Sequence, residues 1–311
     1  MSYSSLDAGG LVLHDPITAA IASAGDFGEI TADGGHVIHG YIETLWLRRL
    51  DGTQEAIVEL PDAWYMQSLN SVSADGRFVG ITGSRSADYA ALLVDMSTGD
   101  VTKLDSSLTT DERASYSSGP VVSGDGQSVA FTFHDGPVGC QGCSNVWIRT
   151  DNGLRLVNAT TTGSRPTTGH SELHDVSGDG RYVLFESSSS DLAGAVTPGT
   201  HLYRRDVTSG TTESIGLHRS IGTASRATMS DDGRRVAAVS TVVIGGFEIN
   251  VIAVHDTTTR TTYVLTGDGT SAPAIGGDYP VGLSADGRTI GYRTWHPDEG
   301  GAHATVARLP P

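Results

Sequence analysis

The chain has 311 residues, of which 18% are charged, and its net charge is −16. This length allows a large core, whereas the acidity disfavours nucleic acid and anionic membrane surfaces, which attract basic proteins. No apolar run approaches the length of a membrane span, so we expect neither a nucleic-acid nor a membrane partner, and we expect a monomer.

Residues 1–10 lack the basic and apolar regions of a signal peptide. The compartment stays open: cytoplasmic as the chain stands, or extracellular or periplasmic if a signal was removed. Lys103 is the single lysine among 20 basic residues, which we interpret as the codon bias of a high-GC bacterial genome.

A short segment that runs into Asp-Gly recurs along the chain, at intervals of 42 to 54 residues. Such fixed self-similarity is the sequence sign of a repeat architecture. The six copies are TADGGHVI, SADGRFVG, SGDGQSVA, SGDGRYVL, SDDGRRVA and SADGRTIG, beginning at Thr31, Ser73, Ser123, Ser177, Ser230 and Ser284. Asp-Gly is a strong hairpin signal, so the aspartates of these turns are predicted to be structural.

Each copy is followed by an alternating strand, a variable loop, a third strand, a second tight turn and a fourth strand. Four antiparallel strands per unit of this length predict a propeller blade. The predicted fold is therefore all-β: one six-bladed β-propeller of four-stranded antiparallel blades over residues 1–311. The blades are expected to start near residues 25, 66, 116, 170, 224 and 278.

The last unit is one strand short, and residues 9–15 resemble a spare strand. Pairing the two would close the ring and remove an exposed sheet edge, so we expect residues 9–15 to complete the last blade. Trp46, Trp147 and Tyr203 occupy the same place in their third strands, and we expect them in the core between blades.

The S-x-D-G-R-x-V-x-F signature resembles the TolB-like, WD-type propeller repeats, over roughly residues 25–311. In that family the blades occur alone, as partner-binding modules or as lids on peptidases. The resemblance implies the fold. Neither the amino-terminal domain of TolB nor a peptidase domain is present in this sequence, and fold does not imply function.

The residues just before each S-x-D-G turn are expected to ring the mouth of the central channel, beside the long loops where binding usually resides. A cavity with convergent polar groups is the default hypothesis for a ligand site. The ligand-binding candidates in chain order are Glu29, Gln67, Asn70, Tyr116, His170 and Arg226. The first hypothesis is a module that binds a small molecule, peptide or protein; the alternative for these polar groups is that they hold channel water.

The second hypothesis is a stand-alone enzyme with acid/base chemistry of the hydrolase, lyase or cyclase type. Its catalytic candidates are Glu172 or His174 as general base and Asp278 or Tyr279 as acid. No nucleophile with its own base is identifiable.

No cofactor is expected. A lower-ranked alternative is a divalent metal, Zn²⁺ or Mn²⁺, on His170, Glu172 and His174, whose spacing of two places them on one face of a strand. Cys140 and Cys143 are the only cysteines. A local disulfide in an oxidising compartment is the preferred interpretation, and two free thiols are the alternative.

Overall fold

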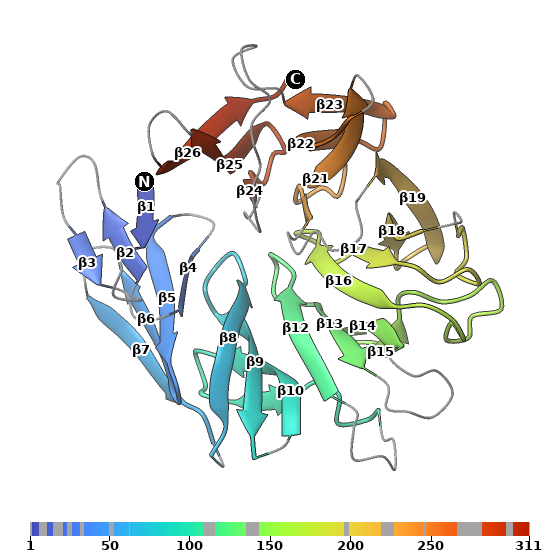
Figure 1. Cartoon of the computed structure of the whole chain (residues 1–311). Coiled ribbons are helices and arrows are strands. Elements are labelled where there is room, and N and C mark those ends of the chain that lie inside the picture. The colour runs from blue at the N-terminus through green and yellow to red at the C-terminus, as the bar shows by residue number, and fades with distance from the viewer. Residues whose placement is uncertain are drawn as a thin grey trace. The chain divides into compact units, whose positions relative to one another are not determined.

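The fold was analysed in a computed structural model (Figure 1). The described residues are 2–5, 11–14, 21–23, 27–31, 34–49, 53–61, 63–86, 88–108, 116–134, 143–195, 199–218, 227–244, 247–265, 282–296 and 301–310. All regular structure in these ranges is β-strand, and they contain no helix long and apolar enough to cross a membrane. The chain divides into two compact units, residues 1–142 with 147–155, and residues 143–146 with 156–311.

The first unit begins with a three-stranded sheet, β1 (Ser2–Ser5), β2 (Leu11–His14) and β3 (Ile21–Ser23). The next sheet contains β4 (Phe27–Ile30), β5 (His36–Tyr41), β6 (Thr44–Arg49) and β7 (Gln54–Glu59). It is followed by β8 (Tyr65–Val72), β9 (Phe78–Arg85), β10 (Asp88–Asp95) and β11 (Val101–Lys103). The next four-stranded sheet contains β12 (Tyr116–Val122), β13 (Val129–His134), β14 (Ser144–Thr150) and β15 (Gly153–Leu156).

The second unit continues the pattern with β16 (Ser171–Val176), β17 (Tyr182–Ser187), β18 (His201–Asp206) and β19 (Thr211–His218). The next sheet contains β20 (Thr228–Met229), β21 (Arg235–Ile244), β22 (Phe247–Asp256) and β23 (Thr261–Leu265). The last sheet has three strands, β24 (Gly282–Leu283), β25 (Thr289–His296) and β26 (Gly301–Arg308). Consecutive strands pair antiparallel within each sheet, as the repeat predicted.

The expected closing strand is in a different place. Residues 9–15 include β2, which pairs with β1 on one edge and with β3 on the other. A strand has only two edges, so β2 has none left for the last blade. The described residues thus form five four-stranded and two three-stranded sheets, and a count of six blades in one domain stays a prediction.

The S-x-D-G turns form as predicted. In the turn that begins at Ser177, the serine Oγ donates to Asp179 Oδ1 at 2.7 Å and accepts the amide of Tyr182 at 2.8 Å. Gly180 has a φ of 70°, which glycine adopts without a steric penalty. The same serine-to-aspartate bond occurs at Ser73, Ser123, Ser230 and Ser284. These aspartates are therefore structural; Asp33 of the first copy lies outside the described residues.

Neighbouring turns are joined by one backbone hydrogen bond at the same repeat position. The amide of Ala74 donates to Gly124 O at 2.9 Å in the first unit. In the second unit Gly178 donates to Asp231 O at 2.9 Å, and Asp231 donates to Ala285 O at 3.0 Å. These hydrogen bonds fix the position of each blade relative to its neighbour at the turns. The strands that begin and end at these turns are therefore held rigidly.

The apolar side chains of facing sheets form the core. Tyr203 is fully buried and stacks on Phe185 with ring centroids 5.6 Å apart, in agreement with the sequence. Trp147 packs, partly buried, against the core of its blade and the preceding one. Trp46 instead stacks on the buried ring of His39 at 5.0 Å.

Candidate functional site

Three exposed tyrosines and a histidine lie at one end of the strands of the first unit. Tyr65, Tyr89 and Tyr116 are the first or second residues of β8, β10 and β12, and they are 41%, 47% and 41% exposed. His134 is the last residue of β13. In an antiparallel sheet, alternate strands start at the same end of the sheet, and the strands between them finish at that end. We call Tyr65, Tyr89, Tyr116 and His134 the aromatic strip.

Register and ring contacts join the members of the aromatic strip. Tyr65 and Tyr89 both lie opposite Ser84 of β9, one on each side of that strand. Tyr89 meets Tyr116 edge-on at 6.4 Å, and Tyr116 stacks on His134 at 4.2 Å. Aromatic pairs in these geometries each contribute about 0.5–1.5 kcal/mol beyond area burial. The rings of Tyr89, Tyr116 and His134 therefore form a preorganised contact series from β10 to β13, and Tyr65 lies across β9 from it.

Polar groups border this surface. Gln67 is exposed and donates from Nε2 to Ser84 Oγ at 2.8 Å. Asn70 is half-buried, and its Oδ1 accepts the hydroxyls of Ser68 at 3.2 Å and Thr82 at 2.8 Å. Gln67 thus lies beside the strip, whereas Asn70 contributes to the packing of β8 on β9.

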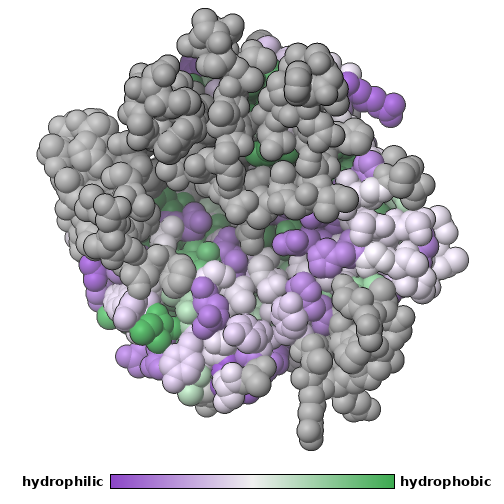
Figure 2. Space-filling model, in the orientation of Figure 1, coloured by the Kyte–Doolittle hydropathy of each residue, from purple (hydrophilic) through white to green (hydrophobic). Residues whose placement is uncertain are grey.

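The sequence located part of this surface. Gln67 and Tyr116 were predicted as binding residues, and the structure brings them to one edge. Tyr89 and His134 were missed, because only the residues just before each turn were considered, and it is the packing of β12 on β10 and its pairing with β13 that bring them to Tyr116. Glu29 is exposed on β4 of the first blade. On the face drawn in Figure 2 the described surface is mainly hydrophilic, with apolar side chains in small separate areas.

In the second unit, the His-x-Glu-x-His stretch begins at His170, just before β16, and continues into that strand. Ser144 Oγ donates to Ser171 O at 2.5 Å and lies 2.7 Å from Nδ1 of His170. Because the hydroxyl hydrogen is used on Ser171, the hydrogen between the two side chains belongs to Nδ1 of His170. Nε2 of His170 is 3.9 Å from the exposed carboxylate of Glu172.

This serine, histidine and glutamate have the residue types of a catalytic triad, but the geometry does not suit a nucleophile. Ser144 is 2% exposed, and its hydroxyl donates to a backbone carbonyl. A nucleophilic serine must donate to its base and reach substrate. His170 and Ser144 therefore anchor the start of β16.

His174 lies at a β-bulge, since the register of β16 on β17 shifts between Leu173 and Asp175. A bulge breaks the alternation of side chains, so the spacing of two does not by itself place His174 on the face of His170 and Glu172. His174 is buried, and its Nδ1 accepts the amide of Ala227 at 3.1 Å. Its Nε2 is 3.1 Å from Glu186 Oε2 of the same sheet, so both ring nitrogens face protein groups, one in its own blade and one in the next.

The metal alternative loses its support for the same reason. His170 and His174 face different partners, and the described residues contain no group of three metal-ligating side chains. Arg226, Asp278 and Tyr279 lie outside the described residues, so their predicted roles stay predictions. Cys143 is in a disulfide; Cys140, the only other cysteine, lies outside the described residues, and their pairing stays a prediction.

Two further buried titratable groups, His39 and Asp105, lie in separate blades of the first unit. Burial, together with the charge of Arg48, lowers the pKa of His39 to about 4. Burial raises the pKa of Asp105, although Ser117 and Lys103 oppose this effect. Both are in the interior of their blades, where a shifted pKa has a structural cause.

The repeated four-stranded antiparallel sheets, joined by hydrogen bonds between neighbouring turns, define the fold class as a β-propeller. The similarity of the chain to solved structures supports the same class. No protein-family model matches the chain, and no curated protein does. Matched structures include TolB from Acinetobacter baumannii, with 17% identity, a TM-score of 0.51, and coverage of 91% of this chain and 60% of that one. The chain has a TolB-like β-propeller fold, and it spans about 60% of that TolB chain.

Two further matches support the fold. An oligogalacturonate lyase from Vibrio parahaemolyticus is 13% identical, with a TM-score of 0.65 over 97% of this chain and 83% of that one. The β-propeller domain of the Trilobed protease from Pyrococcus furiosus is 10% identical, with a TM-score of 0.53 over 96% and 76%. These proteins have different activities and low sequence identity to this chain. The function of this chain must therefore be argued from the arrangement of its own residues.

Proposed function

We propose that this protein is a binding propeller, which takes a peptide, protein or glycan at the long-loop end of its blades through the aromatic strip. The observation that carries the proposal is the contact series from Tyr89 to Tyr116 to His134, in which exposed rings are fixed by one another and by strand pairing. Six copies of the turn, five S-x-D-G and one T-x-D-G, support six repeat blades as part of the same proposal.

Exposed tyrosines on a rigid base are suited to binding. Tyrosine offers a large amphipathic surface at a low cost in side-chain entropy, and it is enriched among the residues that dominate binding energy. Gln67 adds an amide at the border, already oriented by Ser84. A ligand would thus meet apolar faces and hydrogen-bonding groups without first ordering the surface.

The enzyme hypothesis has less support in the described residues. Its general base requires a side chain that can exchange a proton with substrate, whereas His174 is buried and both its ring nitrogens face protein groups. Glu172 is exposed and remains the candidate base. Its proposed acids, Asp278 and Tyr279, are outside the described residues.

The test is a binding screen of the intact protein against a glycan array and a peptide array, followed by calorimetry on the best probe. Replacing Tyr89 and Tyr116 together by alanine should weaken that binding at least tenfold, which is about 1.4 kcal/mol. Ile57→Ala is the matched control, because Ile57 is 50% exposed on β7 and takes no part in the strip.

Two outcomes would overturn the proposal. One is that neither array yields a probe that the intact protein binds. The other is that the double variant, with an unchanged unfolding temperature, binds the probe as tightly as the Ile57→Ala control does.

A further inference from the structure

Three blades share an ion pair beside the S-x-D-G turn. The arginine after the turn glycine pairs with an aspartate at the end of the third strand, and the two join at 2.7 or 2.8 Å. The pairs are Arg77–Asp95, Arg181–Asp206 and Arg234–Asp256. In each, the residue after the aspartate donates its amide to the arginine carbonyl, which fixes the two positions opposite each other. The carboxylate is therefore a regular part of the blade.

The last blade breaks this rule. The amide of Leu309 donates to Arg288 O at 2.8 Å, which is the same backbone bond. The residue before Leu309 is Arg308, and it lies opposite Thr289 in the pairing of β25 with β26. An arginine thus occupies the position of Asp95, Asp206 and Asp256. Arg288 and Arg308 are both exposed, so this blade has two like charges where the other three have an ion pair.

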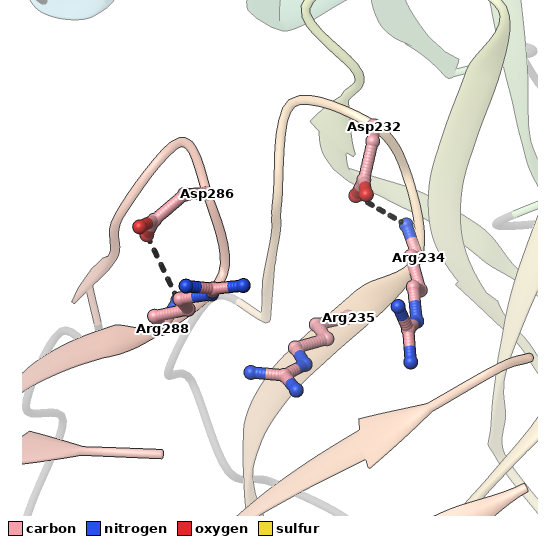
Figure 3. A pocket seen from close by; sticks show the side chains of 5 residues that line it. All are labelled: Asp232, Arg234, Arg235, Asp286 and Arg288. Atoms are coloured by element: carbon pink, nitrogen blue, oxygen red, sulfur yellow. Dashed lines mark hydrogen bonds between the residues drawn. The ribbon is translucent and has the colours of Figure 1, made fainter. Parts of the chain in front are cut away.

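A cavity of about 350 Å³ opens beside Arg288, between the turns of the last two blades (Figure 3). It is lined by Asp232, Arg234, Arg235, Asp286 and Arg288. Figure 3 shows the guanidinium of Arg288 between the two turns, on the side of Arg235. The volume is at the lower end of the range for ligand pockets, which suits one side chain or a small metabolite.

The other groups of the cavity have partners. Arg235 is buried and donates to Gly287 O at 3.0 Å and Pro310 O at 2.7 Å. Arg234 binds Asp256 through Nε at 3.0 Å and Nη2 at 2.7 Å. Asp232 and Asp286 each accept a turn serine and a turn amide on Oδ1.

Arg288 differs from these groups. Within the described part of the chain, Arg288 forms no ion pair with a carboxylate, in contrast to Arg77, Arg181 and Arg234. Its planar fork of N–H groups is shaped for bidentate binding of a carboxylate.

We propose that the cavity beside Arg288 binds a carboxylate group from outside the chain, which gives Arg288 the counter-charge that an aspartate supplies in the other three blades. The ligand is a carboxylate rather than a phosphate for two reasons. Asp95, Asp206 and Asp256 show that this geometry accepts a carboxylate. Asp232 and Asp286 line the same cavity, and they repel two charges held on one phosphate group more than the single charge of one carboxylate group.

Two sources carry this chemistry, a small dicarboxylate and an acidic peptide. Calorimetry at low salt with succinate, with a blocked tri-aspartate peptide and with inorganic phosphate separates them. We expect one of the carboxylate probes to bind, with phosphate at least tenfold weaker, and we expect salt to weaken the binding because the site is exposed.

Two substitutions give the proposal its sharpest test. Arg288→Gln removes the fork and should weaken carboxylate binding at least tenfold. Arg308→Asp supplies the missing aspartate within the chain; it should abolish binding while the unfolding temperature stays equal or rises. Arg260→Gln is the matched control, since Arg260 is an exposed turn arginine of the same unit and should leave binding unchanged.

The proposal is overturned if neither carboxylate probe binds the intact protein or if phosphate binds as tightly as they do. It is also overturned if a stable Arg308→Asp protein retains full carboxylate binding. These results are independent of the aromatic strip, which belongs to the first unit.

Discussion

The carboxylate of Asp175 accepts the backbone amide of Met229 at 2.7 Å and the hydroxyl of Thr228 at 2.9 Å. Asp175 belongs to β16 and its two donors to β20, so one side chain links the first strands of adjacent blades. Ser71 does the same in the first unit, where its Oγ donates to Pro120 O at 3.0 Å and accepts the amide of Val122 at 2.9 Å. Both residues lie two positions before the turn serine.

Asp175→Ala should therefore destabilise the fold. It leaves the Met229 amide without its partner, and the loss of hydrogen bonds to a charged group costs about 1.5–3 kcal/mol. Urea unfolding measures the change. The matched control is Asp151→Ala, an exposed turn residue whose loss should change stability by less than about 0.5 kcal/mol. Equal stability of the two variants would contradict the linking role of Asp175.

His39 should make the fold sensitive to mild acid. Its pKa is lowered to about 4 by burial and by Arg48, whereas an unfolded histidine titrates near 6.5. The unfolded chain thus binds a proton first, and stability should fall as the pH drops from about 6.5 towards 4, by at most about 3 kcal/mol.

His39→Leu removes this proton site and should flatten the dependence of the unfolding midpoint on pH between 7 and 4. His255→Leu is the comparison, because burial lowers its pKa as well but nearby carboxylates oppose the shift. An unchanged slope in His39→Leu would refute the assignment.

Asp105→Asn should be tolerated or stabilising at neutral pH. Burial raises the pKa of Asp105, so the folded state disfavours its ionised form, and its contribution to stability declines as the pH rises through the unfolded value near 3.9. In the next blade the matching position is Asn158, which donates to Ser171 Oγ at 2.9 Å much as Ser117 Oγ donates to Asp105 at 2.8 Å. Urea unfolding at pH 7 and pH 4 tests this, and a loss above about 1 kcal/mol at pH 7 would contradict it.

Asp206→Asn should reduce stability above pH 4 and leave it less sensitive to strong acid. The hydrogen bond from Arg181 lowers the pKa of Asp206 to about 2 against the cost of burial. The stabilisation is present above the unfolded value near 3.9 and is lost as the pH falls through 2. Because Arg181 is 47% exposed, solvent screens the pair, and we expect a loss of about 1 kcal/mol at pH 7.

The unfolding midpoint from pH 2 to 7 gives the readout for Asp206→Asn. The double variant with Arg181→Gln should add little to the single substitution, since each removes the same pair. Additive losses would mean that the two residues act independently.

The repeat and the blade structure could be predicted because their signals are local. Each Ser-x-Asp-Gly fixes its own turn through hydrogen bonds within five residues, as at Ser177, and alternation sets the strands that follow. The strand at 11–14 was also recognised, but it pairs with β1 and β3 and not with the last blade as predicted. Pairing depends on which strand edges are free after the chain folds.

The sequence by itself determined that the chain is acidic, all-β and built of repeats, and it located the turns. It also indicated the end of the blades at which Gln67 and Tyr116 lie. The tertiary structure decided which side chains meet. A bulge turned His174 into the blade interior, and the packing of β12 on β10 brought Tyr89 to Tyr116. The register of β26 on β25 placed Arg308 at the position that an aspartate occupies in three other blades. Bulges, edges and register depend on contacts between segments far apart in the chain, which spacing along the sequence does not encode.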